Sequence, residues 1–340
     1  MVLRRITLYG LLLLLLFLPT LAHAEIVFRS KRAAGSECLY VMDDDGRNIR
    51  KLTDGGWWPV WSPDGKQIAF RKSLPVERGQ TQQFAVFIIN SDGRNLRRLT
   101  DDIEENLDGG RLFEGAPSWS PDGRHIAFTS SRLAKPGISR AEIYTINLET
   151  KAMRRLTRRE SLKTAVSWSP DGKYIAYRDN ALIAGYPTIF VMRANGSGQR
   201  ELVKADLSHF RGFPRWSPDS QSVVYYEDTF GQVDGRLDRV SRKVVIHNIH
   251  TDRRQVVGTP DNWFVHSACF MGSKHLLIST KGRDGNPDKY EIYRYHLVTG
   301  EIVNLTNTPG NDYAMDWIDD DVLSVSPKDK KKVTWGEIKQ

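Results

Sequence analysis

The chain has 340 residues, of which 40% are hydrophobic, and its 49 lysines and arginines exceed its 41 acidic residues by a formal net charge of +8. The excess is mild and is spread over short groups such as Arg97-Arg98 and Arg154-Arg155. Nucleic-acid binding requires a clustered basic stripe, so this composition argues against a nucleic-acid partner.

The first 24 residues have the pattern of a secretory signal peptide. Arg4 and Arg5 precede an apolar run from Leu8 to Leu18, and Ala22-His23-Ala24 provides a small-x-small cleavage site. The apolar run of about a dozen residues is shorter than the roughly twenty needed to cross a bilayer, and no later stretch is apolar enough. We therefore expect cleavage after Ala24 and a periplasmic or secreted mature protein without a transmembrane segment.

The rest of the chain is organised by a repeated ten-residue motif. Its clearest copy runs from Trp168 to Tyr177 and begins Trp-Ser-Pro-Asp-Gly. The tryptophan, or a phenylalanine in its place, marks six positions that lie 47 to 58 residues apart: Trp61, Trp119, Trp168, Trp216, Phe270 and Trp317. A period near fifty indicates a repeat architecture.

Each repeat predicts four short strands. An innermost strand ends at the marker residue, a Pro-Asp-Gly turn follows, and a second strand such as Ile175-Ala176-Tyr177 comes next. Proline presets the first turn angle and glycine accepts positive φ. Third and fourth strands follow, for example Ile189–Met192 and Glu201–Val203. A sheet with two apolar faces cannot bury both alone, and radial stacking into a β-propeller solves this problem.

Six markers predict an all-β, six-bladed propeller over residues 25–326, built from four-stranded antiparallel blades. The strands Ile26–Arg29, Leu39–Met42 and Ile49–Thr53 have no tryptophan strand before them. We therefore expect the strand that ends at Trp317 to join them and close the ring. Residues 322–325 and 332–338 leave a seventh blade as an alternative, and residues 327–340 are expected to be a C-terminal tail or an extra edge strand.

The two cysteines are predicted on different blades. Cys38 falls on a third strand and Cys269 on the innermost strand of the neighbouring blade. This separation argues against a disulfide, and we expect two buried thiols instead.

One face of the ring is expected to carry the function. The connections from a fourth strand to the next innermost strand, and from a second to a third strand, share that face and are long and variable. Variable loops on a rigid scaffold often bind partners. Residues four and five positions before each marker are predicted to ring the mouth of the central channel, with exposed aromatic residues nearby. The candidate partner-binding residues are Trp57, Trp58, Phe113, Glu114, Lys163, Arg211, Phe213, Trp263, His266, Asp312 and Tyr313.

The sequence offers little for catalysis. It contains no Gly-x-Ser-x-Gly elbow and no phosphate loop. His247 and His250 are three residues apart on a predicted strand, where they point to opposite faces. His266 with Asp312 and Glu114 across the channel could hold a metal or perform acid–base chemistry. The leading hypothesis is a non-enzymatic protein-binding module that needs no cofactor. The alternative is a channel-centred enzyme, such as a metal-assisted polysaccharide lyase or hydrolase, or a carbohydrate-binding propeller.

The repeated Trp-Ser-Pro-Asp-Gly-x-x-Ile-Ala-Phe, followed by Ile-Tyr-x-Met-Asn-x-Asp-Gly and Arg-Arg-Leu-Thr patterns, resembles the WD40-like repeats of the TolB family, the periplasmic component of the Tol-Pal system. The resemblance covers residues 25 to about 326. It implies a monomeric periplasmic propeller that binds an envelope protein on its loop-rich face, as TolB binds the lipoprotein Pal. TolB proteins carry an α/β domain before the propeller, whereas Ile26 here begins a blade strand, so contact with TolA is not expected. Prolyl oligopeptidases share the repeat type, but their hydrolase domain has no counterpart in this sequence.

Overall fold

The computed structural model describes residues 24–32, 37–75, 82–100, 113–132, 141–158, 161–180, 186–281, 289–307 and 310–319. The predicted signal peptide before Ala24, the C-terminal tail and the segments considered for a seventh blade lie outside these ranges. Within them, no helix has the length and apolar character needed to cross a membrane.

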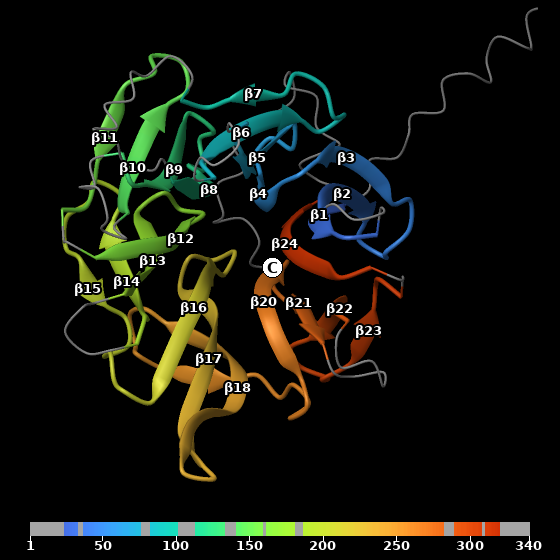
Figure 1. Cartoon of the computed structure of the whole chain (residues 1–340), viewed down its shortest axis with the longest axis vertical. Coiled ribbons are helices and arrows are strands. Elements are labelled where there is room, and N and C mark those ends of the chain that lie inside the picture. Colours follow the sequence, from blue (N-terminus) through green and yellow to red (C-terminus); the bar gives the residue numbers. More distant parts are fainter. Residues whose placement is uncertain are drawn as a thin grey trace, which may run out of the picture.

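The described residues contain 24 strands, which form six four-stranded antiparallel sheets arranged in a ring (Figure 1). From the innermost strand outward, blade 1 consists of β24 (Asp312–Ile318), β1 (Glu25–Ser30), β2 (Cys38–Asp43) and β3 (Arg50–Asp54). Blade 2 consists of β4 (Trp57–Trp61), β5 (Gln67–Ser73), β6 (Phe84–Asn90) and β7 (Arg97–Arg98). Blade 3 consists of β8 (Glu114–Trp119), β9 (His125–Ser130), β10 (Glu142–Asn147) and β11 (Met153–Arg155). Blade 4 consists of β12 (Leu162–Trp168), β13 (Tyr174–Asn180), β14 (Thr188–Arg193) and β15 (Arg200–Glu201). Blade 5 consists of β16 (His209–Trp216), β17 (Ser222–Val233), β18 (Arg236–Asn248) and β19 (Arg254–Val256). Blade 6 consists of β20 (Phe264–Met271), β21 (His275–Lys281), β22 (Glu291–His296) and β23 (Ile302–Asn304).

Blade 1 closes the ring by combining strands from both ends of the described chain. β24 pairs antiparallel with β1, so that Trp317 lies opposite Ile26 and Asp312 lies opposite Ser30. β1 in turn pairs with β2. The predicted six-bladed fold and its closure by N- and C-terminal strands are therefore confirmed.

The hydrophobic core is divided into six clusters, one in each wedge between neighbouring blades. Between blades 1 and 2, for example, Leu39 of β2 packs in one cluster with Trp61 and Phe70. Each blade buries its two faces only against its neighbours, so no blade is stable alone. Cys38 and Cys269 form no disulfide, and both are buried in the cluster between blades 6 and 1.

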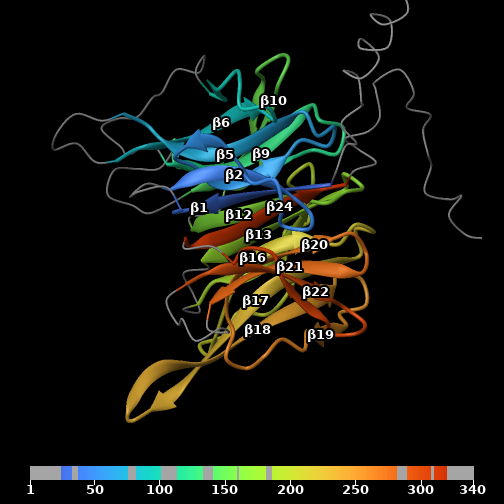
Figure 2. The same cartoon turned by 90° about the vertical axis from the view of Figure 1, so that its right-hand side faces the viewer.

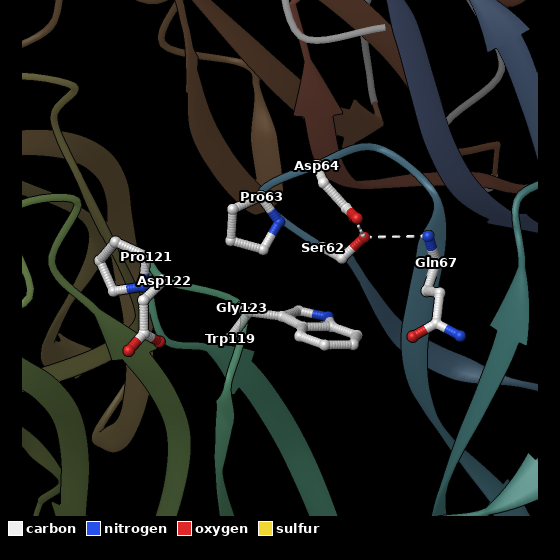
Figure 3. Close-up of a pocket in the computed structure, with 8 residues that line it drawn as sticks. All are labelled: Ser62, Pro63, Asp64, Gln67, Trp119, Pro121, Asp122 and Gly123. Carbon is white, nitrogen blue, oxygen red and sulfur yellow. Dashed lines mark hydrogen bonds between the residues drawn. The ribbon is translucent and has the colours of Figure 1, made fainter. Parts of the chain in front are cut away.

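The Ser-Pro-Asp turn is closed by the same hydrogen bonds in four blades, and its fourth residue is glycine in blades 2 to 4 and Ser220 in blade 5. In blade 2, Ser62 Oγ donates to Asp64 Oδ1 (2.7 Å) and accepts from the backbone N–H of Gln67 (2.9 Å), and this turn lines a cavity of about 240 Å³ with the turn of blade 3 (Figure 3). The equivalent serines of blades 3 to 5 are Ser120, Ser169 and Ser217. The turn motif therefore fixes the local register of the first two strands in each of these blades.

Blade 5 has a long hairpin that projects beyond the ring (Figures 1 and 2). β17 and β18 have 12 and 13 residues and remain paired as far as Val233 and Arg236. The two-residue turn between them, Asp234-Gly235, has positive φ at both positions, as tight hairpins require.

Candidate partner-binding site at the loop face

We call the face with the long connections between blades the loop face, and the face with the Pro-Asp-Gly turns the turn face. A β-bulge in the innermost strand shapes the channel near the loop face. In all six blades, the register between the innermost and second strands shifts part of the way along the strand. In four blades, the residue three positions before the marker has positive φ: 54° at Trp58, 47° at Ala116, 53° at Ala165 and 55° at Phe213. A bulge re-aims side chains, and strained bulky residues of this kind gather at functional sites.

Two of these bulge residues meet from opposite sides of the ring. Trp58 of blade 2 and Phe213 of blade 5 have ring centroids 6.3 Å apart. Phe213 also contacts His266 of blade 6 (5.7 Å), and His266 contacts Tyr313 of blade 1 (4.6 Å). A continuous chain of rings from four blades therefore crosses the channel. It is held in place by the closed scaffold.

Arginine side chains lie over the aromatic rings around this chain. The Arg71 guanidinium is 3.5 Å from the Phe84 ring centroid and 4.5 Å from that of Phe113, and it also lies over Trp58 (5.0 Å). Such cation–π contacts are worth about 0.5–2 kcal/mol each. Equivalent contacts join Arg29 to Tyr313 (4.1 Å), Arg178 to Phe210 (5.3 Å) and Arg242 to Phe264 (4.3 Å).

We call the half-buried rings of this region the aromatic belt. Its members are Trp57, Trp58, Phe84, Phe113, Phe210, Phe213, Phe264, His266, Tyr290 and Tyr313.

Burial keeps the histidine of the belt neutral. Burial, together with the charges of Arg29 and Arg242, lowers the pKa of His266 to about 3. Burial likewise raises the pKa of Tyr290 and Tyr313, so both phenols stay protonated. The positive charge around the belt therefore comes from its arginines and from Lys281, which lies over Phe264 at 5.2 Å, and not from His266.

Four charged residues predicted at the mouth are buried instead. Glu114, Lys163, Arg211 and Asp312 have side chains that are at most 3% exposed. Glu114 pairs with Arg132, and the Lys163 ammonium lies 3.3 Å from Glu142 and 3.8 Å from Asp179. Arg211 binds Glu227 and Asp206, and Asp312 accepts from Arg32 at 2.9 Å. These four side chains are therefore held in buried ion pairs, which leaves little of their surface for a partner to contact.

The tryptophans of the predicted site also divide between core and surface. Trp263 is 2% exposed and packs 5.0 Å from Tyr293, in the cluster between blades 5 and 6. Trp57 is half-buried and contacts Phe84 edge-on at 5.8 Å. Trp263 is therefore a core residue, whereas Trp57 belongs to the aromatic belt together with Trp58, Phe113, Phe213, His266 and Tyr313.

Several members of the belt were missed by reasoning from the sequence. Phe84 begins β6 and Tyr290 directly precedes β22, and both bound long connections of the loop face that were predicted without singling out these rings. Arg71 of β5, which lies over belt rings, was not singled out either. A signal for Arg71 exists, because Arg71 and Arg178 each stand ten residues after a marker tryptophan and each covers aromatic rings of the belt.

The metal or acid–base alternative finds no support in the placement of its residues. Glu114 and Asp312 are each paired with an arginine, and His266 is enclosed by Phe213, Tyr290 and Tyr313. Across the described residues, no three histidine, cysteine or carboxylate side chains converge as a metal site would require.

The sequence matches known propellers. A family model described as the TolB beta propeller domain matches residues 108–238. The Tol-Pal system protein TolB of Francisella tularensis subsp. mediasiatica (strain FSC147) is 27% identical over 222 residues, which cover 62% of this chain and 44% of that protein. The matched segment thus spans less than half the length of this curated relative.

The same fold occurs in solved structures of different function. TolB from Acinetobacter baumannii aligns with a TM-score of 0.53 and 20% identity over 86% of this chain and 66% of its own. Kuenenia stuttgartiensis hydrazine synthase aligns with a TM-score of 0.63 and 15% identity over 86% and 46%. At these identities the structural likeness speaks for the fold alone. This chain is therefore a six-bladed β-propeller whose repeats and sequence are similar to those of TolB propellers.

Proposed function

We propose that this propeller is a non-enzymatic binding module of the cell envelope, and that its aromatic belt docks a partner protein at the loop face. The observation that carries the proposal is the chain of rings from four blades, covered by arginines, at the mouth of the channel. Aromatic residues and arginine dominate the binding energy of protein interfaces.

The rigidity of the belt supports this role. Trp58 and Phe213 are each held by a bulge and by contacts with other rings, so they lose little conformational freedom when a partner binds. Such preorganisation lowers the entropic cost of association. Each ring is also only half-buried, which leaves part of its apolar surface to be covered by a partner.

The class of partner follows from the relatives. Their name places them in the Tol-Pal system, and the repeat resemblance implies binding to a Pal-like lipoprotein. We therefore propose a periplasmic envelope protein as the partner and the periplasm as the location of the mature chain. The predicted signal peptide, which would deliver the chain there, lies outside the described residues.

The proposal is tested with the double variant Trp58→Ala, Phe213→Ala. Alanine already occupies the equivalent bulge positions at Ala116 and Ala165, so the backbone accepts it. With the purified propeller as bait, we expect the wild type to retain an envelope protein from a membrane-envelope extract. The double variant should lose roughly 30-fold or more in affinity, since each hot-spot residue contributes about 2 kcal/mol.

Val298→Ala is the matched control, because Val298 is 85% exposed in the turn after β22, at the opposite end of that strand from Tyr290 of the belt. It should retain the partner as the wild type does. Capture of no envelope protein, or equal capture by the double variant, would contradict the proposal. A thermal melt of each variant separates lost binding from lost folding.

A further inference from the structure

A second cavity lies on the axis at the turn face, on the other side of the bulges from the aromatic belt. It has a volume of about 510 Å³ and is lined by residues from all six blades, including the prolines of three Pro-Asp-Gly turns. Small-molecule sites have volumes of roughly 300–1,000 Å³. The cavity therefore has the size of a ligand site, and no role in the proposed docking of a protein accounts for it.

The walls of this cavity carry one positive and one negative charge. The residue just before the marker lines it in every blade, and in blades 2, 3, 4 and 6 this residue is Val60, Ser118, Ser167 and Cys269. Blade 5 has Arg215 and blade 1 has Asp316 at the same position, and both side chains are half-buried. Two charges thus replace the small side chains that suffice elsewhere in the ring.

These two charges attract each other, since Arg215 lowers the pKa of Asp316, but they form no ion pair in contact. Arg215 and Asp316 act in opposite directions on the pKa of the Cys269 thiol between them, which burial raises to about 12. Arg215 donates to the carbonyl of Pro214 (3.3 Å) and forms no salt bridge with any carboxylate of the described residues. Asp316 Oδ2 accepts from the backbone N–H of Trp61 (2.7 Å).

Asp316 accepts backbone hydrogen bonds and is attracted by Arg215, but among the residues that the structure describes neither charge has an oppositely charged group in contact with it. Partly desolvated charges are costly unless an opposite charge pairs with them. A ligand that brings one group of each sign would satisfy both. Ser118 lies on the other side of the ring, where its Oγ accepts from the backbone N–H of Trp168 (2.9 Å) and its hydroxyl hydrogen remains able to donate. The cavity thus offers a cation, an anion and a hydroxyl donor between tryptophan walls.

We propose that the turn-face cavity binds a small zwitterion of the amino-acid or dipeptide type, with the ligand carboxylate on Arg215 and its ammonium group on Asp316. The guanidinium fork matches a carboxylate in two parallel hydrogen bonds, and Asp316 keeps a second oxygen for the ammonium group. The site lies on the opposite face from the aromatic belt, so it stands or fails independently of the proposed docking function.

The test uses the dipeptide glycyl-L-phenylalanine as a probe, with its N-acetyl and C-terminal amide forms, in calorimetric titrations of the full chain. The wild type should bind the free dipeptide and lose roughly tenfold to hundredfold in affinity for each blocked form, because a charge-assisted hydrogen bond is worth about 1.5–3 kcal/mol. Arg215→Gln should become insensitive to amidation but not to acetylation. Asp316→Asn should show the reverse.

This crossed pattern would not arise from a structural role of either residue. Arg239→Gln, on the projecting hairpin, is the control and should bind the three probes as the wild type does. The proposal is overturned if the wild type binds none of the probes, or binds blocked and free dipeptide equally. The comparison of free and blocked probes on the wild type needs no variant, so it decides the matter even if a substitution unfolds the protein.

Discussion

Asp316 shows how the environment of a single residue determines its charge. Burial raises its pKa, Arg215 and the N–H groups of Trp61 and Trp317 counteract only part of that effect, and the resulting pKa is about 6. At Asp206 burial acts in the same direction, but hydrogen bonds from Ser208, His209 and Arg211 outweigh it and hold the pKa well below its ordinary value. Two carboxylates of one domain therefore affect its stability with opposite signs.

Asp316→Asn is expected to stabilise the protein at neutral pH. Because the folded-state pKa exceeds the ordinary value of 3.8, the folded state holds the proton more tightly, and stability falls as pH rises from about 4 to about 6. Asparagine resembles the protonated acid, so the gain in unfolding free energy should be at most about 3 kcal/mol near pH 7.5 and vanish near pH 4. Urea denaturation at the two pH values measures it.

Asp206→Asn is the control of opposite sign and should destabilise the protein at neutral pH, since its lowered pKa favours the folded carboxylate. A stability of Asp316→Asn below that of the wild type at both pH values would show that the Trp61 hydrogen bond outweighs the burial of charge.

At the scale of the element, the turn and the bulge have separate tasks on one innermost strand. The Ser-Pro-Asp-Gly turn at its end closes the hairpin with local hydrogen bonds, and Ser169 is fully buried there. The bulge within the strand disrupts the ladder and directs Trp58 and Phe213 toward each other. The turn therefore stabilises the blade, and the bulge positions the rings of the aromatic belt.

Ser169→Ala is expected to cost about 1–2 kcal/mol of unfolding free energy. The substitution removes the hydroxyl that accepts from Tyr174 N (2.9 Å) and donates to Asp171 (2.6 Å), and it leaves a buried N–H without that acceptor. Ser197→Ala is the matched control, because Ser197 is exposed, and it should change stability by less than about 0.5 kcal/mol. Equal effects of the two substitutions in urea denaturation would refute a structural role for the turn serine.

At the scale of the whole molecule, closure is the decisive interaction. Blade 1 takes its innermost strand from the C-terminal part of the chain and its other three from the N-terminal part. The cluster between blades 6 and 1 brings Ile26 and Phe28 together with Cys269 and Leu277. Since each blade buries its faces only against its neighbours, an open ring would expose two apolar faces to water.

A chain truncated after Asn311 lacks β24 and is expected to lose about 5 kcal/mol or more, which is comparable to the entire stability of a domain. Thermal melting and limited proteolysis should show an unfolded or molten chain. A synthetic peptide of residues 310–319 added in trans should restore part of the transition. Truncation after residue 326, which keeps β24, is the control, and a melt of the shorter chain that matches this control would refute closure as the source of stability.

The sequence by itself determined the repeats, the four strands of each blade, the turns and the closing strand. The reason is that all of these follow from local chemistry: proline and glycine set the turns, and alternating apolar runs set the strands. Trp317 without later partners and Ile26 without an earlier one were enough to predict their pairing, which the structure confirms.

Only the tertiary structure decided which residues of the predicted mouth are exposed. Glu114, Lys163, Arg211 and Asp312 form buried ion pairs with partners 16 to 280 positions away in the sequence, and the pairing of strands and blades brings these partners together. The same holds for the meeting of Trp58 with Phe213, which are 155 positions apart and come together only because six blades share one axis. The sequence period specifies the strands and turns of each blade. The burial and the contacts of a side chain near the axis depend on residues of the other five blades, which local sequence does not specify.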